Sequence, residues 1–307
     1  MRYSLMTEPQ LGGTYDQLLE LARWAEAESM VSFARSDHYY SSRQPRPDAT
    51  DAFATLAGLA RETSTIRLCV LVSPITFRHP AVIAKTAATI DQMSGGRLDL
   101  GVGTGWMNLE HEVYGMPFPD WPERFDRLSE ALPYLRAAFE QDHASFSGTH
   151  YSIDAEVGPR PTGTRLIVGG SGPQRTPDLA GRYADEYNLF PAPPEELAPR
   201  LEVLRTAASE AGRDPDGIEV TVMGQVMTGR DDADFRRRLA AAAANRNISP
   251  EELEERFTKA HIPIGPPEKV AETMAALEGA GVNRYYLQWL DLDDTEGLET
   301  TWSALRP

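Results

Sequence analysis

The sequence predicts an α/β protein whose eight parallel strands close into a (β/α)8 TIM barrel. Short apolar runs alternate with helical segments from the first residues to the last, without a break in composition. The apolar runs lack polar–apolar alternation, as expected of parallel strands that are covered on both faces. The 307 residues suit a single domain over residues 1–307, since such a barrel takes about 250 residues plus insertions. A doubly wound sheet is the alternative, but eight strand–helix units favour closure.

The clearest unit runs from Ile66 to Trp106. An apolar run at Ile66–Val72 predicts a strand, and a helical pattern follows at Pro80–Met93. Proline suits the first helical position, because its missing N–H would be unpaired there. Gly95–Gly96 can take the left-handed backbone that ends a helix, and a second strand follows at Leu98–Val102. This segment is one complete strand–helix–strand unit.

The other elements follow the same rhythm. Further strands are predicted at Met1–Thr7, Val31–Ser36, Arg165–Val168, Glu186–Phe190, Ile218–Met223 and Arg284–Leu290. Helices are predicted at Tyr15–Met30, Ala52–Arg61, Glu123–Phe139, Pro173–Tyr183, Pro194–Ala211 and Pro266–Gly279.

Two insertions interrupt the alternation of strands and helices, after the fourth and seventh strands. The segment Trp106–Pro122 contains three prolines, which predict an irregular connection without a helix. Connections of this length tend to be lids or binding loops. A hairpin is predicted at Ser145–Asp154. The second insertion, Asp232–His261, contains an alanine-rich helix and a helix start capped by Ser249.

Composition excludes several classes of protein. The net charge of −16 argues against binding to nucleic acid or to an anionic membrane. No apolar run reaches the roughly 18 residues of a membrane span, and the first residues lack the apolar region of a signal peptide. The single cysteine, Cys69, lies within a predicted strand and is expected to be a core thiol. We therefore expect a cytoplasmic protein that acts on a small molecule.

In such barrels the active site lies at the C-terminal ends of the strands. The segments there contain no metal-ligand cluster, Schiff-base lysine, pair of hydrolytic carboxylates or nucleophile with a base. They are rich in glycine and aromatic residues and include one histidine. These segments are Thr7–Glu8, Asp37–Tyr40, Val72–Pro74, Gly103–Asn108, Gly169–Gly172, Asn188–Phe190, Gly224–Gln225 and Gln288–Trp289. Such a rim suits a planar cofactor with a phosphate tail, which itself carries the chemistry.

Two of these segments have specific interpretations. His38 directly follows Asp37 after the second strand, where imidazole could donate a proton or orient a bound ring. The alternative is a histidine satisfied by a neighbouring carboxylate. The Gly169–Gly172 loop opens a helix and could anchor a phosphate, with Arg175 adding positive charge or lying in solvent.

Two further positions near the rim also have alternatives. Trp106 and Asn108 could wall an apolar substrate pocket, or belong to a lid that packs on the rim. His79 precedes Pro80 and is expected to cap a helix rather than to take part in chemistry.

Several of these motifs together resemble the luciferase-like monooxygenase superfamily, and most closely its F420-dependent oxidoreductase branch from actinobacteria. The motifs are Asp37–His38, Ser73–Val82, Ser94–Leu98, Gly101–Trp106 and Gly169–Gly170. The resemblance implies an α/β barrel that binds coenzyme F420 or reduced FMN, with the ring in the barrel mouth. It also implies a homodimer.

The resemblance also assigns roles to particular residues. His38 matches the active-site histidine, next to Asp37 in the cofactor site and Tyr39 in the substrate pocket. The backbone of Val70, Leu71 and Val72 should face the ring, in a strand that often carries a bulge with a non-prolyl cis peptide. The tail should be flanked by Gly103, Thr104 and Gly105, and the phosphate should meet Gly169, Gly170, Ser171 and Gly172.

The sequence departs from the sugar-phosphate dehydrogenases of this branch. Trp106 stands where they carry a glutamate. Their tryptophan shortly after the histidine is also missing, and Tyr39, Tyr40, Ser41 and Ser42 stand there. These aromatic replacements indicate a flatter, more apolar substrate. Cys69–Val70 also replaces the Gly–Thr pair that is common in the third strand.

The leading hypothesis is an F420-dependent oxidoreductase that moves a hydride between the deazaflavin C5 and an apolar or aromatic organic substrate. The alternative is an FMNH2-dependent monooxygenase of the same family. A third hypothesis is a flavin- or deazaflavin-binding protein without catalytic activity.

Overall fold

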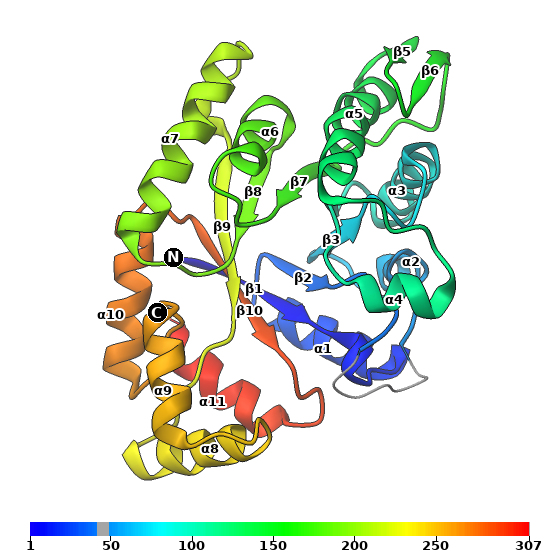
Figure 1. Cartoon of the computed structure of the whole chain (residues 1–307). Helices are drawn as coiled ribbons and strands as arrows, with labels where there is room; N and C mark the ends of the chain where they lie inside the picture. The colour runs from blue at the N-terminus through cyan, green and yellow to red at the C-terminus, as the bar shows by residue number, and fades with distance from the viewer. Residues whose placement is uncertain (42–48, 307) are drawn as a thin grey trace.

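The computed structural model describes residues 1–41 and 49–306, and these form a closed barrel of parallel strands with helices around it (Figure 1). The order around the barrel is β1-β10-β9-β8-β7-β4-β3-β2. The strands are β1 (Arg2–Thr7), β2 (Ser32–Arg35), β3 (Arg67–Pro74), β4 (Leu98–Gly103), β7 (Arg165–Gly169), β8 (Glu186–Leu189), β9 (Glu219–Gly224) and β10 (Arg284–Trp289). The predicted fold class is confirmed.

The helices surround the barrel. They are α1 (Tyr15–Ala27), α2 (Ala52–Glu62), α3 (Pro80–Ser94), α4 (Asn108–Tyr114), α5 (Trp121–Glu140), α6 (Arg175–Tyr183), α7 (Pro194–Glu210), α8 (Asp232–Ala244), α9 (Pro250–Lys259), α10 (Pro267–Gly279) and α11 (Thr295–Leu305). The last of these was not predicted. It contains three threonines and one glycine, which are poor helix formers. It is held by Leu298, Trp302 and Leu305, which are buried in the hydrophobic core.

The prediction that Trp106–Pro122 lacks a helix is wrong. Residues Asn108–Tyr114 form α4, which ends at Gly115 in the left-handed conformation. The first proline, Pro117, lies beyond this helix, and Pro122 lies in the first turn of α5, where a proline is tolerated. The prolines therefore separate two helices instead of preventing one.

Both predicted insertions are present. The hairpin forms as β5 (Ala144–Ser147) and β6 (Ser152–Ala155), which pair antiparallel and lie at one end of α5 (Figure 1). The second insertion forms α8 and α9, which pack on each other around a small hydrophobic cluster of their own. That cluster consists of Phe235, Leu239, Ala243, Leu253, Phe257 and Ile264.

Two apolar layers fill the fold. The outer layer lies between strands and helices and includes the predicted inner face of α3, Ile83, Ala87 and Ile90. The inner layer fills the barrel with Met6, Ala34, Cys69, Leu71, Ile167, Met223 and Tyr286. Cys69 is fully buried, and burial raises the pKa of its thiol well above the usual range, as expected of an unreactive core thiol.

The N-terminal ends of the strands enclose a charged cluster. Glu186 forms an ion pair with Arg284 and accepts a hydrogen bond from the Tyr286 hydroxyl at 2.9 Å. Arg165 pairs with Glu219 at 2.8 Å. Burial raises the pKa of Glu186 to about 6, although Arg284 favours its charged form. Removing one partner of such a buried pair typically costs about 3–5 kcal/mol, so this cluster holds the closed end of the barrel together.

A bulge in β3 shapes the opposite, open end. Val70 pairs with Leu100 and Ser73 with Val102, so Leu71 and Val72 together face Gly101. The peptide between Leu71 and Val72 is cis, as the family resemblance implies.

The bulge directs Val72 toward glycines on two strands. A Cβ atom at Gly169 would lie 2.7 Å from Val72 Cγ1, and one at Gly103 would lie 3.0 Å from Val72 Cγ2. The Val72 side chain therefore occupies space that these glycines leave open.

We predict that Gly169→Ala lowers the free energy of unfolding by about 1–3 kcal/mol, because the added methyl group overlaps Val72. Urea denaturation measures the loss. The cost should shrink in a Val72→Ala background, which removes the overlapping atoms. Gly279→Ala is the matched control, since a Cβ there meets no atom within 4 Å. An equal cost of Gly169→Ala in both backgrounds would contradict this packing.

Candidate active site

His38 lies just beyond the end of β2, with its side chain 18% exposed. Its Nδ1 atom is 2.9 Å from Glu110 Oε1. A carboxylate only accepts hydrogen bonds, so Nδ1 carries the hydrogen. The indole of Trp106 approaches the imidazole edge-on, with 5.5 Å between ring centres. The Nε2 atom is therefore the ring nitrogen that remains for exchanging a proton with a bound molecule.

Glu110 comes from α4 and is only 1% exposed. Its second oxygen accepts the Tyr39 backbone N–H at 3.2 Å, so the carboxylate fixes both His38 and the residue after it. Burial alone would lower the pKa of His38. The hydrogen bond and charge of Glu110 outweigh burial and raise that pKa, with smaller contributions from Glu8 and Asp37.

Asp37 is buried below His38 and joins three segments. It accepts a hydrogen bond from Ser73 Oγ at 2.7 Å and forms an ion pair with Arg78. Arg78, from the loop after β3, also pairs with Asp51 at the start of α2. Asp37 therefore serves as a structural anchor that fixes the backbone on which His38 stands.

Tyr39 belongs to the same network. Its hydroxyl donates to Asp51 at 2.6 Å, and its ring stacks on Phe77 with 4.9 Å between centres. Burial raises the pKa of this hydroxyl. The side chain therefore ties the β2 loop to its neighbours, in addition to any contact with a substrate.

The glycine loop after β7 leads to an uncapped helix. The Gly170 N–H donates to Asn188 O at 2.9 Å, and Ser171 Oγ accepts from the Phe190 N–H at 3.2 Å. A Cβ at Gly172 would lie 3.2 Å from Thr176 Oγ1. Gln174, which precedes α6, makes no side-chain capping bond, so the first N–H groups of α6 are suited to an anion.

Arg175 is the candidate for an additional positive charge at this loop. It lies in the first turn of α6, half-exposed, and pairs with Asp126 at 3.1 Å. Its guanidinium also lies over the Phe125 ring, at 4.4 Å from the centre.

The loop after β4 is held by a hydrogen bond from α5. Gly105 has a φ of +77°, and its carbonyl oxygen accepts a hydrogen bond from Arg124 at 2.6 Å. Thr104 is half-buried, and Trp106 is 69% exposed. Asn108 is exposed, and its amide donates to Glu112 at 2.5 Å. Trp106 therefore stands against His38, whereas the amide of Asn108 is engaged along α4.

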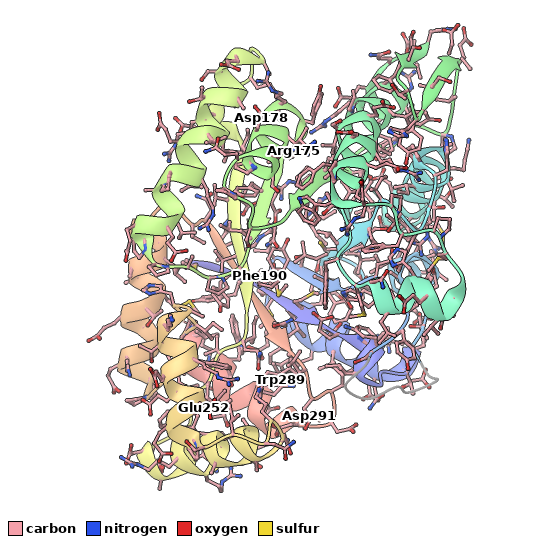
Figure 2. All side chains as sticks on the ribbon, viewed as in Figure 1. Arg175, Asp178, Phe190, Glu252, Trp289 and Asp291 are labelled. Carbon is pink, nitrogen blue, oxygen red and sulfur yellow. The ribbon has the colours of Figure 1, made fainter. Side chains whose placement is uncertain are left out.

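Aromatic residues from other strands complete the mouth. Phe190 follows β8 and is 57% exposed, and Trp289 ends β10. Figure 2 shows both in the central part of the view, with Arg175 above them at the start of α6. The Trp289 Nε1 atom is buried and finds no hydrogen-bond partner among the described residues.

Sequence reasoning missed Glu110 and Arg78 as site residues. Glu110 lies in the helix that was not predicted, and Arg78 reaches Asp37 only through the fold. A helical pattern over Asn108–Tyr114 followed by Gly115 was the one signal that could have revealed Glu110. The predicted cap role of His79 is confirmed, because its Nδ1 atom accepts the Ala81 N–H.

The described residues offer neither a metal site nor a membrane span. Outside residues 42–48 and 307, no three His, Cys, Asp or Glu side chains gather as they would around a metal ion. Within the same ranges, no helix is both long and apolar enough to cross a membrane.

This fold and site define a class of protein. The family model described as luciferase-like monooxygenase matches residues 1–284, and the chain belongs to this family. That family comprises F420- and flavin-dependent oxidoreductases.

Particular relatives carry more specific names. The F420-dependent glucose-6-phosphate dehydrogenase of Microbacterium testaceum is 34% identical over 209 residues, which are 66% of this chain and 62% of that protein. The enzyme of the same name from Segniliparus rotundus is 26% identical, covering 95% of this chain and 93% of that protein. Among solved structures, an F420-dependent secondary alcohol dehydrogenase with an F420–acetone adduct has a TM-score of 0.79 at 22% identity. That match covers 100% of this chain and 99% of the other, and it shows the shared fold.

We predict that Glu110→Gln lowers the pKa of His38, because the amide can still bond to the ring but no longer carries the charge that stabilises imidazolium. Titration of the histidine signals by NMR measures the shift. Glu112→Gln, on the exposed side of the same helix, is the control and should leave that pKa in place. An unchanged His38 pKa in Glu110→Gln would show that the ion pair does not control it.

Proposed function

We propose that this protein is an F420-dependent oxidoreductase that moves a hydride between the deazaflavin C5 and an apolar or aromatic organic substrate. The observation that carries the proposal is the His38–Glu110 pair, held at the barrel mouth with one imidazole nitrogen left for proton exchange. The printed names of the curated relatives support F420 as the cofactor.

The residues at the mouth fit such a cofactor. Val72 is partly exposed above the inner layer of the barrel and offers an apolar floor for a flat ring. The uncapped start of α6, after Gly169–Gly172, offers N–H groups to a phosphate. The orphaned Nε1–H of Trp289 offers a further donor. When bound, F420 supplies a carbon centre that gives or takes a hydride.

His38 manages the proton that accompanies the hydride. Glu110 holds the hydrogen on Nδ1, so Nε2 is the atom that gains or loses the reaction's proton. In substrate reduction the protonated ring donates its proton to the oxygen or carbon atom that becomes negatively charged on hydride addition, which forms the O–H or C–H group. In substrate oxidation the neutral ring accepts the proton that the substrate loses with its hydride. Because Glu110 raises the pKa of His38, the ring keeps its proton to a higher pH than an ordinary imidazole does.

The exposed aromatic residues indicate the type of substrate. Trp106 and Phe190 present large apolar surfaces at the mouth, at 69% and 57% exposure. Exposed aromatic surface of this size beside a reactive histidine suits an apolar partner. The proposal therefore favours an apolar or aromatic compound over a sugar phosphate.

The alternative function is an FMNH2-dependent monooxygenase, which the name of the family supports. It would use the same mouth, but oxygen would be the second substrate. The identity of the cofactor decides between the two.

We predict that F420 binds at micromolar concentration and that FMN binds at least about tenfold more weakly, a difference of about 1.4 kcal/mol. Absorbance and fluorescence titration of the purified protein with each compound measures both affinities. Tighter binding of FMN than of F420 would favour the monooxygenase.

We predict that His38→Ala lowers kcat by about 10²–10⁴-fold, as removal of a general acid–base does, and leaves F420 binding largely intact. Isopropanol, cyclohexanone and glucose 6-phosphate serve as first probe substrates, with F420 reduction or oxidation followed at its absorbance band. A substrate that His38→Ala turns over at the normal rate would exclude the proposed role of His38.

The same role predicts opposite pH profiles in the two directions. Reduction needs protonated His38, so kcat/KM should fall as pH rises through the raised pKa of His38. Oxidation needs the neutral ring, so its kcat/KM should rise over the same interval. Both inflections should move to lower pH in Glu110→Gln. Profiles that do not move would show that a group other than His38 causes the inflection.

A further inference from the structure

His111 follows Glu110 in α4 and is buried, with 1% of its surface exposed. Its Nδ1 atom lies 2.9 Å from the Met107 carbonyl oxygen, and its Nε2 atom lies 2.7 Å from Thr76 Oγ1. Phe118 and Phe77 enclose the ring, at 4.4 and 5.0 Å between centres. Both nitrogens of this histidine are therefore occupied by protein, and neither is available for chemistry.

The two hydrogen bonds of His111 determine which ring nitrogen donates and which accepts. A carbonyl oxygen only accepts, so Nδ1 carries a hydrogen and donates to Met107. In the neutral ring Nε2 is then an acceptor, and it receives the Thr76 hydroxyl hydrogen. The bond thus connects the loop after β3 with the helix that carries Glu110.

The helix α4 needs such an attachment. It spans only Asn108–Tyr114, and Met107 at its N-cap makes no side-chain capping bond. Isolated helices shorter than about 12 residues are marginal in water, so tertiary contacts must hold it. Among the described residues, side chains of α4 make four hydrogen bonds to neighbouring segments. Glu110 bonds to His38 and to the Tyr39 N–H, His111 bonds to Thr76, and the Tyr114 hydroxyl donates to Tyr39 O at 3.3 Å.

Thr76, the partner of His111, is itself in contact with other parts of the site. Thr76 lies in the loop after β3 and also abuts the β4 loop, because a Cβ at Gly105 would lie 3.2 Å from Thr76 Oγ1. The same β3 loop carries Arg78, which pairs with Asp37 below His38. One loop therefore supports His38 through Arg78 and the partner of His38 through Thr76.

We propose that Thr76 and His111 are positioning residues, which hold Glu110 at hydrogen-bond distance from His38. The inference rests on the proposed function only in that His38 is the group they serve. Neither residue touches the reacting atoms; they act through the placement of α4. The alternative is a purely structural role, in which the bond contributes stability without affecting His38.

The test removes only the hydroxyl. Thr76→Val keeps the shape of the side chain and leaves the buried Nε2 of His111 without a donor. We expect the pKa of His38, measured by NMR in the protein without cofactor, to fall as it does in Glu110→Gln. We expect kcat to fall about tenfold or more with the Kd for F420 changed by less than about twofold, as for a loss of alignment.

Two variants make the result specific. Thr76→Ser keeps the hydroxyl and should show the native His38 pKa and the native kcat. Thr89→Val makes the same chemical change on the exposed face of α3 and should change neither. Near-UV circular dichroism and thermal unfolding of each variant show whether it is folded.

Folded Thr76→Val with an unchanged His38 pKa would overturn the positioning role, whatever its stability. The NMR measurement needs neither cofactor nor substrate. It therefore separates this inference from the proposed function, which instead fails if His38→Ala retains normal turnover.

Discussion

The bulge in β3 is the constraint on which the mouth of the barrel depends. One extra residue between Val70 and Ser73 reverses the face of the sheet to which the later side chains of the strand point. Ser73 then meets Asp37, and the loop beyond it brings Thr76 to His111 and Arg78 to Asp37. A strand in regular register would turn Ser73 to the opposite face, because side chains along a strand alternate with a period of two.

The bulge also explains the glycines of the neighbouring strands. Gly103 and Gly169 end β4 and β7, where Val72 lies against their Cα atoms. Both were predicted as cofactor contacts, and nothing in their packing prevents that role. Their packing nevertheless gives a separate reason for glycine, since a Cβ at either position would crowd Val72.

The ion pairs at the two ends of the barrel differ in their burial. At the closed end, Glu186 and Arg284 are fully buried and paired, which suits an element that holds strands together. At the mouth, Glu110 is buried but His38 is partly exposed. This asymmetry lets a fixed negative charge act on a group that still reaches solvent. His38 has only one ring nitrogen bonded to Glu110, whereas both ring nitrogens of His111 are hydrogen-bonded within the protein.

The sequence by itself determined the architecture and the location of the site. Apolar runs, helix starts and glycine stops are local signals, so they identified the eight strands, both insertions and the mouth segments with His38. Only the tertiary structure decided which side chains meet. Glu110 lies 72 residues from His38, and Arg78 lies 41 residues from Asp37, so neither pair leaves a local pattern. The short helix that carries Glu110 escaped prediction because its stability comes from contacts with distant loops, which a local pattern does not contain.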